Sequence, residues 1–383
     1  MILTTCAACA APLAHEAPRC VRCKTRYCNS TCQHDHWRRG HKQICKKIHR
    51  GGNAEQYDAE NKYKDAVVVA VEACAADTKG QKCYICLEAV HLRTGEGLVR
   101  GCACGDRGGV ASPELGVAHV SCLAEQAKIL VAEAEEDNLG WKTEDERFRR
   151  WHACGLCEQN YHGVVSCALG WACWKKYVGR PEMDDVRCMA MNQLGNGLHA
   201  AGHYEDALSL REDELSKLRR LGASGESLLV VQGNIAGTYD MLGRLEDSLR
   251  MQKDVYSGTL RLLGKEHYDT LREANNYGDS LASLGRLGEA KSLLLKIIPV
   301  ARRVLGGSHD ITLKMRWSYA RALHMDEGAT DGDLREAVNT LEETERTARC
   351  VLGVAHPTAK GIETALRKAR AALRAREPPP GAA

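Results

Sequence analysis

The chain has 383 residues, of which 44% are hydrophobic and 27% charged, and its formal net charge is +3 at pH 7. This length allows two or three domains, and the composition is ordinary for a globular protein. The net charge is too small to indicate nucleic acid or an anionic membrane surface as a partner, so the class of partner must come from motifs.

Cysteine is the residue type with the most informative distribution. All 19 cysteines except Cys188 and Cys350 precede residue 174, mostly as short-spaced pairs accompanied by histidines. The N-terminus has no secretory pattern, and no apolar run reaches the roughly 20 residues that span a bilayer. We therefore expect no membrane span, an intracellular compartment, either cytoplasmic or nuclear, and zinc sites rather than disulfides.

Residues 1–50 contain eight candidate metal ligands. The apolar side chains here are too few to build a core that offsets the entropy of ordering so short a segment. We expect zinc to supply the missing stability, of the order of 10 kcal/mol per structural site. Two closed four-ligand sites leave no position for a catalytic water, so this zinc is structural. The candidate ligands are Cys6, Cys9, Cys20, Cys23, Cys28, Cys32, His41 and Cys45.

This motif resembles a MYND-type zinc finger, in particular at Tyr27-Cys28, Cys32-Gln33, Trp37 and Gly40-His41. The resemblance implies a peptide-docking groove lined by Gln33 and Trp37, and the alternative is that Trp37 packs inside the small core. His34 and His36 are alternative donors to His41. The resemblance also implies interleaved ligands, with Cys6, Cys9, Cys28 and Cys32 on one zinc ion and Cys20, Cys23, His41 and Cys45 on the other.

Residues 51–79 read as a helical linker, because Ala54 to Ala76 has no internal Gly or Pro. A second set of ligand pairs follows within residues 80–180. A pair separated by one or two residues can hold one tetrahedral metal ion from a tight turn. Four pairs provide enough ligands for two zinc ions: Cys83 with Cys86, Cys102 with Cys104, His119 with Cys122, and Cys154 with Cys157.

These pairs resemble a RING-CH finger. The family's activity implies a ubiquitin ligase that binds a ubiquitin-conjugating enzyme through an apolar surface, to which Ile85 would belong. Gln126 stands where many members have Trp, and the interval from Cys122 to Cys154 is longer than usual. An inactive RING-shaped scaffold is therefore the alternative. The implied zinc sites are Cys83, Cys86, His119 and Cys122 for one ion, and Cys102, Cys104, Cys154 and Cys157 for the other.

Residues 181–376 are organised as a repeat. Leu221-Gly222, Leu263-Gly264 and Leu305-Gly306 recur at steps of 42 residues. Glycine suits these turns because a left-handed residue often ends a helix. The pattern predicts about four helix pairs from Met189 to Cys350 and a terminal helix from Thr358 to Arg376, stacked as a solenoid because one pair cannot bury its apolar face alone.

The repeat resembles tetratricopeptide repeats of the kinesin-light-chain type, which present a concave groove for extended peptides. The resemblance places Asn234, Asn275 and Asn276 where groove-facing side chains could sit, although Asn also caps and packs at such positions. The histidines that follow each Leu-Gly step have no cysteine partners nearby, so we interpret them as turn residues: His267, His309 and His356.

The predicted fold is two small zinc-stabilised cross-brace modules followed by an all-α tetratricopeptide-repeat solenoid, with residues 377–383 as a disordered tail. Two functions fit: a RING-type ubiquitin ligase whose MYND and repeat modules recruit substrates, or a non-enzymatic adaptor with four structural zinc ions. The partners are proteins or extended peptides. Nucleic acid is disfavoured because no concentrated basic and aromatic surface is evident, and the cations near the first module suit an acidic protein equally well: Arg38, Arg39, Lys42, Lys46 and Lys47.

Overall fold

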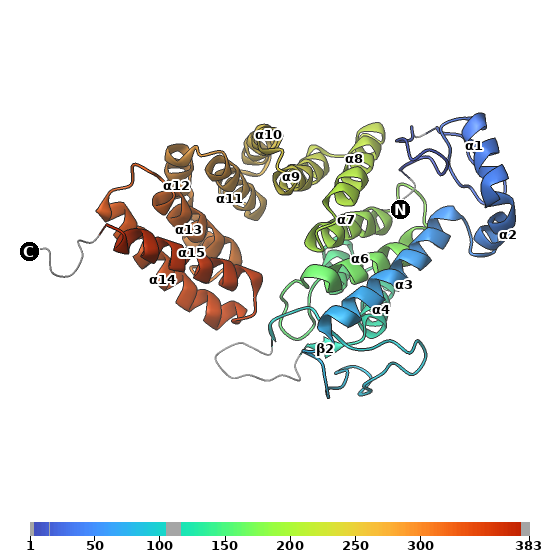
Figure 1. Ribbon diagram of the computed structural model, residues 1–383, viewed down its shortest axis with the longest axis horizontal. Helices are drawn as coiled ribbons and strands as arrows, with labels where there is room; N and C mark the ends of the chain where they lie inside the picture. Colours follow the sequence, from blue (N-terminus) through green and yellow to red (C-terminus); the bar gives the residue numbers. More distant parts are fainter. Residues whose placement is uncertain (1–3, 15, 105–115, 377–383) are drawn as a thin grey trace, which may run out of the picture. The chain divides into compact units, whose positions relative to one another are not determined.

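The computed structural model describes residues 4–14, 16–104 and 116–376. The predicted tail at 377–383 lies outside these residues. The chain divides into two compact units, the first made of residues 1–102 and 116–221 and the second of residues 103–115 and 222–383. Helices dominate both units (Figure 1). None of the described helices combines the length and the apolarity that a bilayer span requires.

The first unit contains short helices around the ligand pairs and longer helices that form its core. Strands β1 (Val99–Arg100) and β2 (Val117–Ala118) pair antiparallel, with Val99 opposite Ala118. The helices are α1 Ser30–His36, the π-helical turn η1 Trp37–His41, α2 Lys42–Arg50, α3 Ala54–Cys74, α4 Val120–Glu136, α5 Trp141–Phe148, the 3-10 turn η3 Arg149–Trp151, α6 Gly163–Tyr177, α7 Asp185–Ala200 and α8 Tyr204–Arg220.

Helix α6 is the centre of this unit. Eleven of its 15 residues are buried, among them Trp171, Cys173 and Trp174. A helix that is apolar on all sides must be covered on all sides, and α6 packs against α3, α4 and α7 (Figure 1). The aromatic density of this segment therefore serves packing between the linker helix, the second set of ligand pairs and the first helix pair of the repeat.

Helices α6 and α7 approach closely because each has a glycine at the contact. A Cβ atom on Gly197 would lie 2.7 Å from the Ser166 carbonyl oxygen, and one on Gly170 would lie 3.1 Å from the Leu194 Cα. These neighbours are backbone atoms, which cannot rotate away as a side chain can. The absence of side chains at Gly170 and Gly197 thus sets the distance between the two helices.

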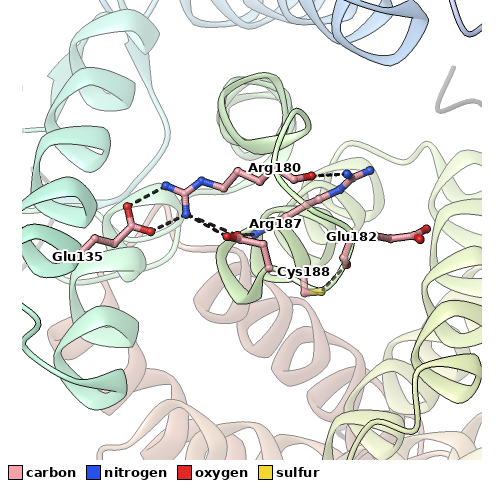
Figure 2. Close-up of polar contacts among 6 residues, drawn as sticks. Glu135, Arg180, Glu182, Arg187 and Cys188 are labelled. Carbon is pink, nitrogen blue, oxygen red and sulfur yellow. Dashed lines mark hydrogen bonds and ion pairs between the residues drawn. The ribbon is translucent and has the colours of Figure 1, made fainter.

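A polar network ties the segment after α6 to the surrounding helices. Figure 2 shows Arg180 reaching Glu135 of α4, with two parallel hydrogen bonds of 2.5 and 2.8 Å, and Asp184 at 3.4 Å. Arg187 of α7 donates to the Arg180 carbonyl oxygen at 2.6 Å and pairs with Glu55 of α3 at 3.4 Å. The hydrogen bond from Arg180 lowers the pKa of Glu135. Paired guanidinium and carboxylate groups of this geometry fix orientation more than they add stability, because the groups are about one-third exposed.

The second unit is an array of antiparallel helix pairs. Leu271, Leu294 and Leu313 come from three successive helices and are fully buried in one core. Together with α7 and α8 the array gives the predicted four pairs and a terminal helix, so the all-α repeat is confirmed. Its helices are α9 Gly225–Met241, α10 Leu245–Leu263, α11 Tyr268–Ser283, α12 Leu287–Val304, α13 Asp310–His324, α14 Asp331–Leu352 and α15 Pro357–Arg374.

The histidines interpreted as turn residues are the N-caps of α11, α13 and α15. In each case the ring Nδ1 accepts a hydrogen bond from the backbone N–H two residues later, at 3.1 to 3.2 Å for His267, His309 and His356. An N-cap side chain satisfies one of the N–H groups that the first turn of a helix leaves unpaired. The Gly-x-x-His motif therefore marks where the first helix of a pair begins.

We predict opposite effects on stability for a Gly→Ala substitution at the α6–α7 contact and for one at an open position in α9. We expect Gly197→Ala to destabilise the protein by about 1–3 kcal/mol, because the new methyl group overpacks a backbone contact. Gly237→Ala in α9 is the matched control, since nothing lies within 4 Å of its Cβ position. Alanine there should stabilise the helix by about 0.5–1 kcal/mol. Thermal unfolding of the zinc-loaded protein measures both, and equal stability of the two variants would contradict the contact.

Candidate metal centres

The sixteen predicted ligands come together as four separate groups. In each group one donor atom per residue lies within 4.8 Å of the others. The composition of the groups matches the sets that the two resemblances imply. The groups are Cys6, Cys9, Cys28 and Cys32; Cys20, Cys23, His41 and Cys45; Cys83, Cys86, His119 and Cys122; and Cys102, Cys104, Cys154 and Cys157.

The first group is held by a tight turn at Cys6 and by the start of α1. The backbone N–H of Ala8 points at the Cys6 sulfur at 3.4 Å, as expected of a turn that wraps a thiolate. The Cys9 sulfur lies 3.2 Å from that of Cys28 and 3.7 Å from that of Cys32. Cys9 is exposed, so this group is the most accessible of the four to solvent.

The second group is fully buried and includes the ring of His41. The Cys23 sulfur lies 3.3 Å from His41 Nε2, and the Cys20 and Cys45 sulfurs are 3.8 Å apart. Gly40 precedes His41 with a φ of +129°, a backbone conformation that only glycine adopts without strain. This kink lies within η1, between α1 and α2, and the His41 that follows it is buried.

In the third group the histidine faces the sulfurs with its Nδ1 atom, whereas His41 of the second group uses Nε2. His119 Nδ1 lies 3.3 Å from the Cys86 sulfur and 3.6 Å from the Cys122 sulfur. The Ile85 N–H points at the Cys83 sulfur at 3.4 Å, the same turn geometry as at Cys6. The ring of His91 is 5.3 Å from that of His119, but His91 Nδ1 is engaged by Thr94, so His91 does not join the group.

The fourth group consists of four buried cysteines on two turns. The Leu156 N–H points at the Cys154 sulfur at 3.4 Å. The Glu158 N–H closes the turn by donating to the Cys154 carbonyl oxygen at 2.9 Å. All four sulfurs come from the pairs Cys102 with Cys104 and Cys154 with Cys157. A set of four thiolates is the donor set of structural zinc.

The donor distances fit a tetrahedral zinc ion. A Zn–S bond of about 2.3 Å requires neighbouring sulfurs in a tetrahedron to be about 3.8 Å apart. Four sulfur pairs in the first two groups lie 3.2 to 3.9 Å apart, far beyond a disulfide bond of about 2.05 Å, and all donor atoms of a group lie within 4.8 Å of one another. Four donors fill the tetrahedron, so each group would hold its ion without an open position.

The crowded sulfurs change each other's affinity for protons. Burial raises the pKa of Cys6, but N–H groups of Ala8 and neighbouring residues lower it, with a net fall to about 6. Hydrogen bonds with the Cys9 and Cys6 sulfurs raise the pKa of Cys28 to about 12. Metal binding must displace protons from such thiols, so zinc affinity should rise with pH.

Three buried cysteines of the first unit lie outside the four groups. Cys74, Cys167 and Cys173 are buried in the helical part of the first unit. Burial raises the pKa of Cys167 to about 11, which makes it a poor nucleophile. These residues behave as small apolar side chains in the core.

The residues with predicted partner-binding roles differ in exposure. Trp37 is 41% exposed and Gln33 is half-buried one helical turn before it. Asn234 and Asn276 are half-buried, and Asn276 donates to Glu273 at 3.1 Å. Asn275 is only 4% exposed. The burial of Asn275 disfavours the groove-facing position that the resemblance to tetratricopeptide repeats implied for it.

Ile85 lines a pocket beside the third group. The pocket has a volume of about 420 Å³, and its wall includes Cys122, Gln126 and Ile129 of α4. Ile85 is 37% and Ile129 48% exposed. Ile129 was missed from the sequence; its only signal was its position three residues after Gln126, on the same face of a helix.

Two family models match the chain. One is the MYND finger, at residues 6–45, and the other a tetratricopeptide repeat, at residues 228–269. No curated protein matches. The chain therefore carries a MYND finger and a tetratricopeptide repeat, whereas the RING-CH resemblance rests on the motif and on the third and fourth groups.

Several solved structures are similar to this chain. The nearly identical TPR-like repeats of a Podosopora anserina protein described as a kinesin light chain are 22% identical, covering 50% of this chain and 88% of that chain, with a TM-score of 0.40. BtubC (BKLC) from P. vanneervenii is 13% identical, covering 69% and 96%, with a TM-score of 0.33. The TPR2AB domain of yeast Sti1, in a complex with pHSP90, is 14% identical, covering 65% and 99%, with a TM-score of 0.21. These TM-scores are low, so the repeat assignment rests on the family match and the helix pairs.

Single ligand substitutions test the second and third groups separately. We expect the native protein to hold four zinc ions, and Cys23→Ser and Cys122→Ser to hold three each, because one missing thiolate opens one closed site. Cys350→Ser is the control, since Cys350 is exposed and belongs to no group. Elemental analysis of the purified variants measures the zinc content. Retention of four ions in Cys122→Ser would contradict the third site.

Proposed function

We propose that this chain is a zinc-stabilised protein-interaction protein in which the MYND finger and the repeat each bind a segment of a partner protein. The observation that carries this proposal is the closed character of all four groups, since each supplies four donors. Zinc with four protein ligands has no position for a water or a substrate. The ions then serve to hold surfaces in place rather than to catalyse a reaction.

The surface of the MYND finger supports a docking role. The ring of Trp37 contacts the ring of His41, a candidate zinc ligand, with centroids 5.8 Å apart and a tilt of 57°, and Trp37 is 41% exposed. Tyr27, which is fully buried, fills the small core instead. An exposed tryptophan held by a rigid neighbour is a favourable anchor for a peptide because little entropy is lost on binding.

The repeat supports a second binding surface. Asn234 of α9 and Asn276 of α11 are 42 residues apart and occupy equivalent positions in successive pairs. A side-chain amide can donate to and accept from a peptide backbone at the same time. A row of such amides suits an extended peptide whose backbone groups are otherwise unpaired.

Selection from a random dodecapeptide display library on the zinc-loaded chain tests the proposal. We expect enriched peptides whose affinity falls about tenfold or more with Trp37→Ala, because truncating a central aromatic anchor costs about 2 kcal/mol. A second class should depend on Asn276→Ala instead. Trp141→Ala is the matched control, since Trp141 is an exposed tryptophan on α5 outside the finger. No enrichment, or equal losses for the two tryptophans, would contradict the proposal.

The pocket beside the third group favours a second candidate, a RING-type ubiquitin ligase. Ligases of this type bind a charged conjugating enzyme through an apolar surface next to a zinc site, and Ile85 and Ile129 form such a surface here. Gln126, which replaces the family's tryptophan, is in the pocket wall, so the surface is less apolar than the family pattern. This candidate adds an activity to the interaction role and leaves the zinc structural.

Ubiquitin discharge from a panel of charged conjugating enzymes separates the two candidates. The ligase candidate predicts discharge that falls about tenfold or more with Ile85→Ala or Ile129→Ala, because each removes an apolar anchor. Leu87→Ala should have no effect, since Leu87 is an exposed leucine that does not line the pocket. All variants should keep their zinc. No discharge from any enzyme, with four zinc ions present, leaves the interaction role alone.

A further inference from the structure

We propose that the outer face of α2, together with Arg38 and Arg39, binds an acidic segment of a partner protein. This inference rests on the proposed interaction function and names the chemistry of one partner. The cations are all exposed and belong to one stretch of the MYND finger: Arg38, Arg39, Lys42, Lys46, Lys47 and Arg50.

The helical period gathers these charges on one side of α2. Cys45 and Ile48 point into the finger and are buried. Lys42, Lys46 and Arg50 recur every four residues and so lie in one row on the opposite side, with Lys47 beside them. The second zinc group fixes this helix through Cys45, so the row of charges is presented by a rigid support.

The charges on this face are not compensated within the finger. Residues 30–50 contain these six cations and a single acidic residue, Asp35. Among the described residues none of the six cations forms an ion pair, and Lys47 lies only over the Tyr57 ring at 5.9 Å. Some exposed cations elsewhere are paired, for example Lys64 with Glu60 at 3.1 Å and Arg286 with Glu289 at 2.7 Å.

An uncompensated row of like charges is unfavourable in the free protein. Like charges four residues apart on a helix face each other and repel, which destabilises the helix. An acidic segment relieves this repulsion and gains attraction at the same time, which raises both the rate of association and the specificity. The face therefore complements several carboxylates in a row.

The finger favours a protein segment over a nucleic acid. Helix α2 has nine residues, a length of about 14 Å, which spans few phosphates. Binding of single-stranded nucleic acid uses several stacking aromatic side chains, whereas Trp37 is the one exposed Trp, Tyr or Phe among the described residues of the finger. Ile44 is also exposed on α2. An exposed apolar side chain of this kind suits an apolar residue within an acidic peptide.

The test uses the full-length, zinc-loaded protein and two fluorescein-labelled dodecapeptides. One peptide contains six glutamates around a central Leu-Pro, and in the other each glutamate is replaced by glutamine. We expect fluorescence anisotropy to show at least tenfold tighter binding of the acidic peptide, with a difference that shrinks as salt is added. The triple variant Lys42→Gln, Lys46→Gln and Arg50→Gln should lose about tenfold in affinity for it.

A matched triple variant removes the same charge elsewhere. Lys253→Gln, Arg261→Gln and Lys265→Gln remove three exposed cations of the second unit and should leave binding unchanged. Equal binding of the two peptides, failure of both to bind, or equal losses in the two triple variants would overturn the inference. So would tighter binding of a twelve-nucleotide DNA strand that the α2 variant abolishes. Elemental analysis distinguishes failure of this inference from failure of the proposed function. Protein that contains no zinc refutes the proposed function. Protein that contains four zinc ions but does not prefer the acidic peptide refutes this inference alone.

Discussion

The structure depends on bringing fourteen thiols and two imidazoles into four groups of closely spaced donors. Apart from helices, the ligand-bearing segments have little regular structure: one two-residue strand pair and a few isolated bridges. Such segments do not bury enough apolar surface to offset their conformational entropy. Binding of one cation by four donors ties together turns that are far apart in the sequence, and this supplies the missing stability.

The segments that carry the zinc ligands pack against the helices of the first unit and do not form isolated modules. Helix α6 is buried among α3, α4 and α7, and the glycines at the α6–α7 contact bring a helix after the last ligand pair against the first helix of the repeat. Arg180, after α6, pairs with Glu135 of α4 (Figure 2), and Arg187 of α7 pairs with Glu55 of α3. Loss of a zinc site should therefore also destabilise helices outside the turns that carry its ligands. The outer surfaces of the modules, such as Trp37 and the row of cations on α2, remain available to partners.

Much of this could be predicted from the sequence because ligand spacing and repeat period are local signals. The sixteen ligands and the helix pairs follow from spacing, but the pairing of ligands into groups came from the family resemblances, since eight donors can be divided in many ways. Whether a side chain faces a groove or a core depends on tertiary packing and cannot be predicted from its neighbours in the sequence. Asn275 and Asn276 are adjacent in α11 and identical in type, yet Asn275 is buried and Asn276 only half-buried. Ile129 lies beside Ile85 only because the fold brings α4 against the turn at residues 83–86, a contact that the sequence does not reveal.

Hydrogen exchange before and after chelation tests most directly whether zinc holds the first unit together. The amides of residues 6–50 and 83–157 should lose protection when a strong chelator removes the zinc, and α6 should weaken with them because α4 is one of its supports. Helices α9 to α15 contain none of the four groups and should keep their protection. Unchanged protection in the first unit after complete removal of zinc would show that side-chain packing alone maintains it, and would contradict this account.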